Sequence, residues 1–277
     1  MSNRALVALR WVLTTLATAV VSRWLRYALE DRPRMRQPHE KEEEVGLSAA
    51  QYARLMQRWP VTAIYRRVVS LASQRLGMAD SAPGRPPRVL DIGCGPGTLA
   101  SAIAVARPHA TVIGLDPSTD MLRVGRRRVV DSRVLLIQGD GAALPIKEGS
   151  IDLAVATLAL HHWRDGEGVL REMRRVLHGT GQVLLFDLRR DIAVPLWLLV
   201  RLATHFVGVV GRLSGGDPAG SVAAAYTPAE AEWLAGRAGL SGVFGRGGAA
   251  WLWLEGARTS PPGPLSIDGE GESVGGG

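Results

Sequence analysis

The stretch Val89–Ala100 reads Val-Leu-Asp-Ile-Gly-Cys-Gly-Pro-Gly-Thr-Leu-Ala and decides the fold of this chain. Apolar residues and one carboxylate, Asp91, precede glycines at alternate positions, and helix-forming residues follow. This order predicts the end of a strand, a tight turn without bulky side chains and the start of a helix. Because the first N–H groups of a helix have no partner within it, a ligand can lie directly on such a turn. We therefore expect a ligand-binding site where this strand ends.

The length and composition are those of a globular protein. The chain has 277 residues, of which 46% are hydrophobic and 21% are charged, enough for one large domain with appendages. The net charge of +7 comes almost entirely from arginines scattered along the chain, a distribution that argues against a nucleic-acid partner. The single cysteine, Cys94, cannot form an internal disulfide, which favours a reducing compartment such as the cytoplasm. No spacing of His and Cys indicates a zinc site.

From residue 88 onward, strand and helix patterns alternate. Strands are predicted at residues 88–92, 111–115, 134–138, 151–157 and 182–187, and helices at 97–106, 118–130 and 165–177. The run at 151–157 is almost wholly apolar, as in a buried parallel strand. A helix at 227–238 and two strands, at 241–244 and 249–255, follow and could close the domain as a hairpin. This rhythm predicts an α/β fold with a doubly wound sheet.

Residues 1–36 form an apolar and basic N-terminal segment. The uncharged run Trp11–Val21 is about half the ~20 residues that a membrane-spanning helix needs. Arg10, Thr14, Thr18 and Ser22 recur every four residues and would form one polar stripe on a helix. Three interpretations stay open: a helix packed on the domain, an interfacial membrane helix with its arginines near anionic lipid, and a spanning anchor or signal peptide.

The remaining segments complete the predicted domain organisation. Residues 37–87 are predicted to be a helical lead-in and linker, with helices over 47–76 that break at Trp59-Pro60 and a Pro/Gly-rich loop at 79–87. The main domain should cover 88–258 and include an apolar helix at 192–213, which could be a lid over the pocket, a membrane contact or an outer-layer helix. A loop is expected at 211–220. Residues 259–277 are rich in Pro, Gly, Ser and Glu and should form a disordered tail.

Two kinds of ligand fit the glycine turn. Residues 95–100 match the dinucleotide fingerprint G-x-G-x-x-A, which on its own is a weak signal. Asp91, however, stands at the strand end that a pyrophosphate would approach, where a carboxylate repels a dianion and attracts a cation. A ligand that carries an ammonium or a sulfonium and no phosphate suits the turn better.

The chain resembles the class I S-adenosylmethionine-dependent methyltransferases, and in particular their small-molecule group, over residues 88–255. Residues 89–97 resemble the first motif of that family, Gly114-Leu-Asp-Pro-Ser118 the second, and Gly139-Asp-Gly-Ala142 with Leu144-Pro145 the adenine-side motif. Residues 175–181 resemble the turn before the fifth strand, although His178 and Thr180 depart from the usual Lys-Pro-Gly-Gly. The resemblance implies a Rossmann-like fold with a mostly parallel, seven-stranded sheet and S-adenosyl-L-methionine as cofactor.

The resemblance also implies which residues bind the cofactor. Asp91 and the glycines would hold its methionine part, and Asp116 would accept hydrogen bonds from both ribose hydroxyls, as a carboxylate can from a diol. Asp140 would accept one from the exocyclic amine. The full predicted set comprises Asp91, Gly93, Cys94, Gly95, Gly97, Asp116, Pro117, Asp140, Gly141 and Leu158.

The methyl acceptor is indicated less directly. His161 and His162 follow the fourth strand and are candidates for a general base near neutral pH, or they only shape the pocket. Thr157-Leu-Ala159 stands where enzymes that methylate amino groups of bases or glutamine carry Asn-Pro-Pro-aromatic, which argues against a nucleic-acid base as acceptor. No acidic cluster suggests a catalytic metal, and none is expected.

The leading hypothesis is a cytoplasmic methyltransferase acting on a small molecule. The two apolar helices further suggest an acceptor that is hydrophobic or membrane-resident, and a peripheral position on the cytoplasmic face of the membrane. The alternatives are an NAD-type dinucleotide-dependent oxidoreductase and a non-catalytic, methyltransferase-like membrane-binding protein. The oligomeric state stays open.

Overall fold

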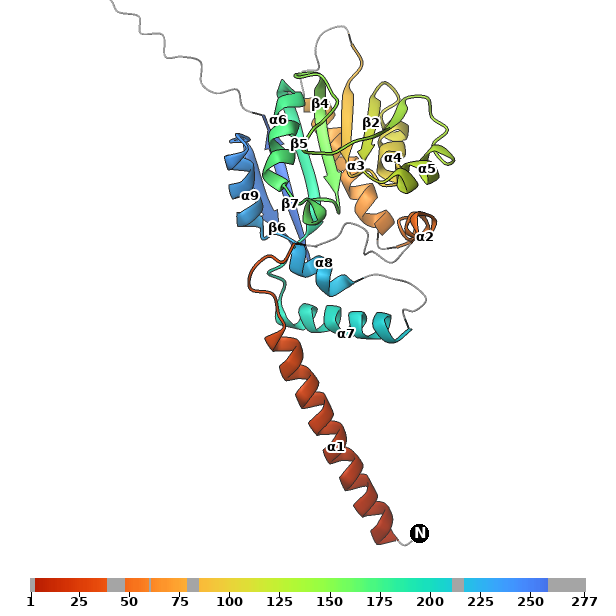
Figure 1. Ribbon diagram of the computed structural model, residues 1–277, viewed down its shortest axis with the longest axis vertical. Helices are drawn as coiled ribbons and strands as arrows, with labels where there is room; N and C mark the ends of the chain where they lie inside the picture. Colours follow the sequence, from red (N-terminus) through yellow and green to blue (C-terminus); the bar gives the residue numbers. More distant parts are fainter. Residues whose placement is uncertain (1–2, 39–47, 60, 79–84, 211–216, 259–277) are drawn as a thin grey trace, which may run out of the picture.

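The computed structural model describes residues 3–38, 48–59, 61–78, 85–210 and 217–258. Its core is a seven-stranded sheet with the strand order β3-β2-β1-β4-β5-β7-β6 (Figure 1). The strands are β1 (Arg88–Ile92), β2 (Thr111–Asp116), β3 (Val134–Gln138), β4 (Ile151–Thr157), β5 (Leu177–Leu188), β6 (Val243–Gly247) and β7 (Trp251–Ala257). The pairs among β1 to β5 are parallel, whereas β7 runs antiparallel to both β5 and β6. The predicted doubly wound, mostly parallel, seven-stranded fold is confirmed.

Helices cover both faces of the sheet because strand residues bury alternate side chains on opposite faces. On one face, Leu90 and Ile92 pack with α6 (Gly166–Val176) and α9 (Pro228–Arg237). On the other, Val89 packs with α3 (Val61–Met78) and α4 (Thr98–Ala106). Every residue of β4 is buried, as expected for a central strand covered on both faces.

The sheet brings two carboxylates to one edge. In the β1–β2 pairing, Asp91 lies opposite Gly114 and Ile92 opposite Leu115, so Asp116 follows directly beyond the paired residues. Both strands run in the same direction, and their carboxyl ends therefore meet where the glycine turn begins. Ligands of open α/β sheets bind outside this edge.

Several predicted boundaries differ from the structure. Helix α5 (Thr119–Arg126) ends before residue 130 because the chain turns at Gly125, whose carbonyl accepts from the N–H groups of Arg128 and Val129. Strand β5 begins at Leu177 and not at Gln182. The loop predicted at 211–220 was wrong from Pro218 onward, because α8 (Pro218–Ala224) begins there with proline in its first turn.

Other expectations hold or lie outside the described residues. The break around Trp59 separates α2 (Ala49–Leu55) from α3, and β6 and β7 form the expected hairpin with slightly shifted ends. The apolar segment after β5 is helix α7 (Val194–Val210). The tail at 259–277 and the segments 39–47 and 79–84 are not among the described residues.

Helix α1 (Asn3–Glu30) projects from the body of the molecule and contacts it through its C-terminal end (Figure 1). There Ala28 is buried, its carbonyl accepts a 2.6 Å hydrogen bond from Trp197 Nε1, and Arg201 forms a 2.9 Å ion pair with Asp31. Trp11 is 71% exposed. The interpretation of a helix packed along the domain is therefore wrong for most of α1. None of the described helices has both the length and the apolar character to cross a membrane.

Candidate functional site

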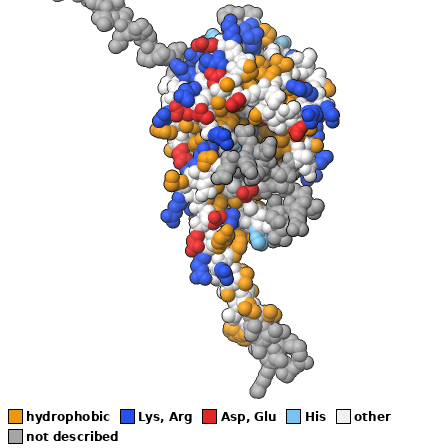
Figure 2. Space-filling view, viewed as in Figure 1, with side chains coloured by type: hydrophobic (Ala, Val, Ile, Leu, Met, Phe, Trp, Pro, Cys, Tyr) orange, Lys and Arg blue, Asp and Glu red, His pale blue; other side chains and the backbone are white. Residues whose placement is uncertain are grey.

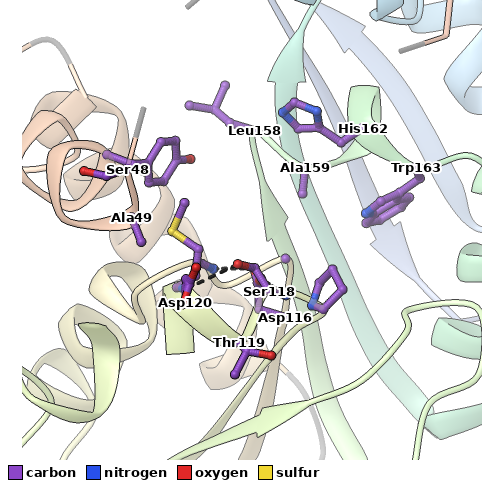
Figure 3. A pocket seen from close by; sticks show the side chains of 15 residues that line it. Ser48, Ala49, Asp116, Ser118, Thr119, Asp120, Leu158, Ala159, His162 and Trp163 are labelled. Carbon is purple, nitrogen blue, oxygen red and sulfur yellow. Dashed lines mark hydrogen bonds between the residues drawn. The ribbon is translucent and has the colours of Figure 1, made fainter. Parts of the chain in front are cut away.

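A pocket of about 660 Å³ opens at the carboxyl ends of β1, β2 and β4 (Figure 3). Four segments form its wall: the glycine turn after β1, the turn and first residues of α5 after β2, the loop after β4, and helix α2. The lining residues are Ser48, Ala49, Tyr52, Gly93, Gly95, Asp116, Pro117, Ser118, Thr119, Asp120, Met121, Leu158, Ala159, His162 and Trp163. The predicted residues Gly93, Gly95, Asp116, Pro117, Leu158 and His162 are thus brought together at one cavity.

The glycine turn presents bare backbone to this pocket. Gly93, Gly95 and Gly97 have φ values of +73°, +53° and +72°, which side-chain-bearing residues rarely adopt. A Cβ atom on Gly93 would lie 2.7 Å from the Cβ of Ala159. A Cβ on Gly95 would point toward Tyr52, 3.5 Å from its Cε1 atom, and would occupy space that a ligand can now fill. Gly97 itself is the N-cap of α4 and does not line the pocket.

The two carboxylates differ in their surroundings. Asp116 is fixed in the wall, because its Oδ2 accepts from the N–H of Gly95 at 2.7 Å and its Oδ1 from that of Ser118 at 2.9 Å (Figure 3). Asp91 is only 1% exposed, and within the described part of the chain its Oδ2 has no hydrogen-bond partner. Burial, and after it the charge of Asp116, raises the pKa of Asp91 to about 7. An unpaired buried oxygen is costly and indicates that a ligand supplies the missing donor or cation.

Five predicted cofactor residues lie outside the pocket lining: Asp91, which is buried behind the glycine turn, Gly97, and the three described next. The Sγ of Cys94 packs against Gly114, where a Cβ would lie 2.9 Å away, and burial raises the pKa of this thiol. Gly141 packs against Ile92. Asp140 is exposed, and its Oδ1 accepts from the N–H of Ala142 at 2.9 Å. The structure therefore gives Cys94 and Gly141 packing roles and places Asp140 in a turn of its own.

Leu158 holds the strained turn at the end of β4. Its φ of +55° makes it the one non-glycine residue of the described chain with a positive φ, a conformation that costs an L-residue about 1–2 kcal/mol. Its N–H donates to the carbonyl of Phe186 on β5 at 2.8 Å, which secures the turn. Such strain is tolerated where function requires a particular backbone path. Here that path places Leu158, Ala159 and His162 on the pocket wall.

The paired histidines have different positions. The Nδ1 of His161 lies 2.6 Å from Asp187 Oδ1 at the end of β5, and its backbone N–H donates to Asp187 Oδ2 at 2.9 Å. His161 is buried and does not line the pocket. His162 does line it, and its ring centroid lies 4.0 Å from that of His161. Of the two candidate bases, only His162 is placed where it can reach a substrate.

The comparisons with known proteins agree with this geometry. Residues 90–185 match the family model described as a methyltransferase domain. This region is a class I S-adenosylmethionine-dependent methyltransferase domain. The demethylmenaquinone methyltransferase of Porphyromonas gingivalis is 32% identical over 152 residues, which are 52% of this chain and 60% of that protein. A malonyl-[acyl-carrier protein] O-methyltransferase of Legionella pneumophila is 34% identical over 108 residues, 38% of each protein.

Solved structures show the same fold. A putative S-adenosyl-L-methionine-dependent methyltransferase of Methanococcus maripaludis superposes with a TM-score of 0.59 over 82% of this chain and 100% of that one, at 18% identity. The family match over residues 90–185 confirms the expected family and cofactor for the methyltransferase domain, the superposition confirms its fold, and the dinucleotide-dependent oxidoreductase has no support. The chain spans less than two thirds of the length of the two curated relatives named above.

The residues of the methyltransferase domain fit S-adenosylmethionine. This cofactor carries an ammonium, a sulfonium and a ribose diol but no phosphate. The unpaired Oδ2 of Asp91 suits a cationic or hydrogen-bonding group, and the bare backbone at Gly95 leaves room beside Tyr52. Asp116 retains acceptor capacity, since a carboxylate offers about four lone-pair sites. Nothing at this turn resembles the all-donor cradle that a pyrophosphate needs.

Helix α2 supplies pocket residues that the sequence analysis missed. Ser48, Ala49 and Tyr52 line the cavity, and burial, then the charges of Asp116, Asp187 and Asp91, raise the pKa of Tyr52 to about 12. Ser48 caps the helix and Gln51 completes a capping box. That Ser-x-x-Gln pattern predicts the start of a helix, but it does not indicate that the helix lines the pocket.

Arg36 is a second contribution from outside the methyltransferase domain. Its Nε donates to the carbonyl of Ala224 at 2.8 Å and its Nη2 to that of Trp163 at 3.1 Å, while its guanidinium lies 4.2 Å from the ring centroid of Tyr226. Burial lowers the pKa of Arg36. In the sequence it is one of many arginines behind α1. In the structure it secures the pocket loop after β4. The described residues of α7 do not line this pocket.

Proposed function

We propose that this chain transfers the methyl group of S-adenosylmethionine to a small, lipophilic acceptor at a membrane surface. One observation carries the proposal: a single pocket joins the glycine turn and Asp116 on one side to an apolar and aromatic wall on the other (Figure 3). Leu158, Ala159 and Trp163 form that second wall, and Tyr52 borders it. Ligand sites of this kind are mostly apolar with a few placed polar groups.

Each side of the pocket has its own task. Asp91, Gly93, Gly95 and Asp116 hold the cofactor, which when bound supplies an activated methyl group on a sulfonium. The apolar wall excludes water and aligns the acceptor for an in-line displacement, which is the main contribution that such a reaction needs. His162 accepts the proton that an O–H, N–H or C–H acceptor releases as its new bond to the methyl carbon forms. His161, held by Asp187, positions His162 and does not touch the acceptor.

Helix α1 supports a membrane surface as the place of reaction. Leu13, Leu16, Val20 and Tyr27 are exposed at helical spacing on one face. Figure 2 shows hydrophobic side chains along the projecting helix and arginines where it meets the body. The hydroxyls of Thr14, Thr15 and Thr18 donate to backbone carbonyls four residues earlier, so they need no partner from water. Met1–Glu30 contains arginines but only one acidic residue, Glu30. These features are typical of an interfacial helix on anionic lipid.

The named relatives indicate the range of acceptors. One is named for demethylmenaquinone and the other for a malonyl-acyl carrier protein. A quinone-like acceptor agrees with the apolar pocket wall and with the exposed face of α1. We therefore favour the lipophilic class.

Labelled S-adenosylmethionine tests the proposal. We expect the full chain, incubated with methyl-labelled cofactor and a bacterial cell extract, to place label in the organic-solvent fraction. His162→Gln should reduce labelling about 100-fold or more at unchanged affinity for S-adenosylhomocysteine. Asp116→Asn should lose both labelling and affinity. Label confined to the aqueous fraction would contradict a lipophilic acceptor, and binding of S-adenosylhomocysteine without any labelled product would identify a non-catalytic protein.

A further inference from the structure

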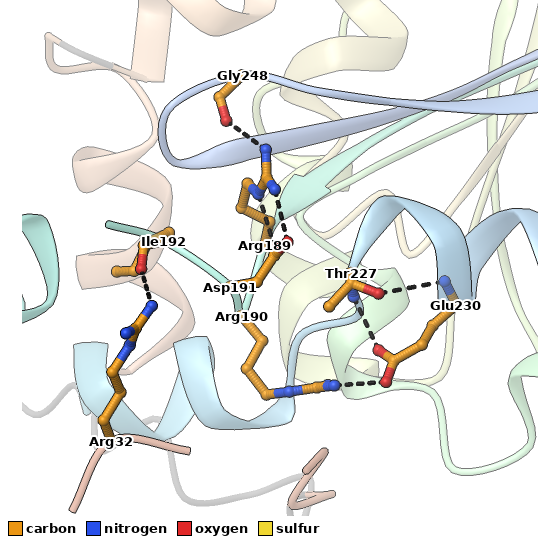
Figure 4. A network of polar contacts seen from close by, with 8 residues as sticks. All are labelled: Arg32, Arg189, Arg190, Asp191, Ile192, Thr227, Glu230 and Gly248. Atoms are coloured by element: carbon orange, nitrogen blue, oxygen red, sulfur yellow. Dashed lines mark hydrogen bonds and ion pairs between the residues drawn. The ribbon is translucent and has the colours of Figure 1, made fainter. Parts of the chain in front are cut away.

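A second pocket lies at the base of α1, away from the cofactor site. It has a volume of about 400 Å³ and lies where the end of α1 meets the chain after β5 and the start of α7. Arg32, Arg34 and Arg190 line it, together with Asp191, Thr227 and the first residue of α7, Val194. Figure 4 shows the polar network around it. No residue of this pocket lines the cofactor pocket.

Among the described residues, two arginines of this pocket have no carboxylate partner. Asp191 is held by Arg189, with contacts of 2.7 and 2.6 Å, and this pairing lowers the pKa of Asp191 (Figure 4). Arg190 donates to Glu230 and to the carbonyl of Ala225. Both carboxylates are thereby neutralised. Within the part of the chain that the structure describes, the guanidiniums of Arg32 and Arg34 therefore give the pocket its positive charge.

Arg32 and Arg34 have guanidinium N–H groups that can donate hydrogen bonds to a ligand. Arg32 Nη2 donates to the neutral carbonyl of Ile192 at 2.5 Å, and this is one of five N–H donors on its guanidinium (Figure 4). Arg34 is exposed, and its side chain forms no hydrogen bond or ion pair with any part of the chain that the structure describes. The positive end of the α7 dipole points to the same place, because Val194 begins that helix.

We propose that this pocket binds the phosphate of an anionic phospholipid headgroup. The proposal rests on the membrane contact in the proposed function and adds a specific lipid site to it. Guanidiniums bind phosphate oxygens in pairs of parallel hydrogen bonds, and Arg32 and Arg34 both line this pocket. Leu29 and Val194 supply apolar lining next to the arginines, as the glycerol and upper acyl chain of a lipid require. Leu29 belongs to α1, the helix that carries the exposed apolar side chains.

Vesicle flotation with the full chain tests the pocket. We compare vesicles of phosphatidylcholine alone with vesicles that also contain phosphatidylglycerol. The unmodified chain should float with the anionic vesicles, and Arg34→Gln should weaken this binding about fivefold, an effect that shrinks at high salt. Arg127→Gln removes the same charge from an exposed position after α5 and serves as the matched control. It should leave vesicle binding unchanged.

A second pair of measurements separates this pocket from the membrane contact itself. Leu16→Glu on the exposed face of α1 should lower binding to both vesicle types. If Leu16→Glu abolishes binding while Arg34→Gln behaves like Arg127→Gln, the membrane contact stands and the headgroup site is overturned. If the unmodified chain floats with neither vesicle, both fail. Arg34-dependent binding of inorganic phosphate in calorimetry, without vesicle binding, would overturn the lipid assignment. Unchanged affinity for S-adenosylhomocysteine shows that each variant is folded.

Discussion

At the scale of single residues, the site depends on two carboxylates with opposite environments. Asp116 accepts backbone N–H groups through both oxygens and lines the pocket. Asp91 is buried behind the turn with one oxygen unpaired among the described residues. The free protein therefore carries an electrostatic cost at Asp91 that a cationic ligand can relieve. The Asp91 carboxylate lowers the folding stability of the free protein and raises its affinity for the ligand, a trade-off that is common at functional sites.

Asp91→Asn should raise the folding stability of the free protein. The folded-state pKa of Asp91 is raised to about 7, so the folded protein holds this proton more tightly than the unfolded chain does. The bound proton on Asp91 therefore stabilises the folded protein fully below pH ~4, and this stabilisation is lost as the pH rises through 7. At pH 8 we expect Asp91→Asn to raise the free energy of unfolding by about 1–3 kcal/mol. Denaturant titrations between pH 4 and 8 measure this, and the variant should lack that pH dependence.

The same variant should bind the cofactor less well. Calorimetry with S-adenosylhomocysteine should show at least a tenfold loss of affinity for Asp91→Asn, because the ammonium of the ligand loses its anionic partner. For the unmodified chain, the affinity should rise with pH between about 5 and 7 as Asp91 ionises. A variant that is less stable than the parent at pH 8 and binds equally well would show that Asp91 has another role.

At the scale of elements, the short helix α2 has an importance out of proportion to its length. It is seven residues long, begins at a capping box on Ser48 and presents Tyr52 to the pocket. The ring of Tyr52 lies opposite the bare backbone of Gly95. Since burial keeps its hydroxyl protonated at neutral pH, the contribution of Tyr52 is the packing of its ring and not its ionisation.

Tyr52→Ala and Tyr52→Phe should therefore differ. We expect Tyr52→Ala to weaken the binding of S-adenosylhomocysteine about tenfold, as loss of a buried aromatic contact does, and Tyr52→Phe to weaken it less than twofold. Leu55→Ala, at a residue of the same helix that is 44% exposed, is the matched control and should bind like the parent. Equal affinities of all these variants for S-adenosylhomocysteine, measured by calorimetry, would show that α2 does not contribute to cofactor binding.

At the scale of the whole molecule, one small interface holds the projecting helix to the body. Trp197 is fully buried on α7 and donates to the carbonyl of Ala28, and Arg201 pairs with Asp31 beside it. Arg36 continues the connection from the end of α1 to the pocket loop at Trp163. The direction of α1, and with it the geometry of any membrane contact, depends on these few contacts.

Trp197→Phe should loosen this attachment. The substitution keeps an aromatic ring but removes the indole N–H, and we expect it to cost about 1 kcal/mol of folding stability. Tryptic cleavage after Arg23 and Arg26 should become several-fold faster because the end of α1 detaches more often. Trp59→Phe, at an exposed tryptophan, controls for the change of residue type. An unchanged rate of cleavage would show that the hydrogen bond to Ala28 does not hold the helix.

The sequence by itself determined the alternation of strands and helices, the glycine turn and the preference for a cationic ligand without phosphate, whereas the seven-stranded sheet and S-adenosylmethionine were implied by the family resemblance. The first three depend on local patterns: an apolar strand run, glycines that alone tolerate positive φ, and a carboxylate at a strand end, as at Asp91, Gly95 and Asp116. Errors arose where context overrode the local pattern, as in the early end of α5 and the unrecognised α8.

Only the tertiary structure decided which residues share the pocket. His161 turns inward because Asp187, 26 positions away, accepts both its backbone and its ring hydrogen bond, and this leaves His162 at the cavity. Arg36 reaches Trp163 across 127 positions, and α2 lies over a turn that follows it by some forty residues. Such contacts between distant segments leave no periodicity or spacing in the chain, because nothing local depends on them. The packing of the folded molecule alone brings these side chains together.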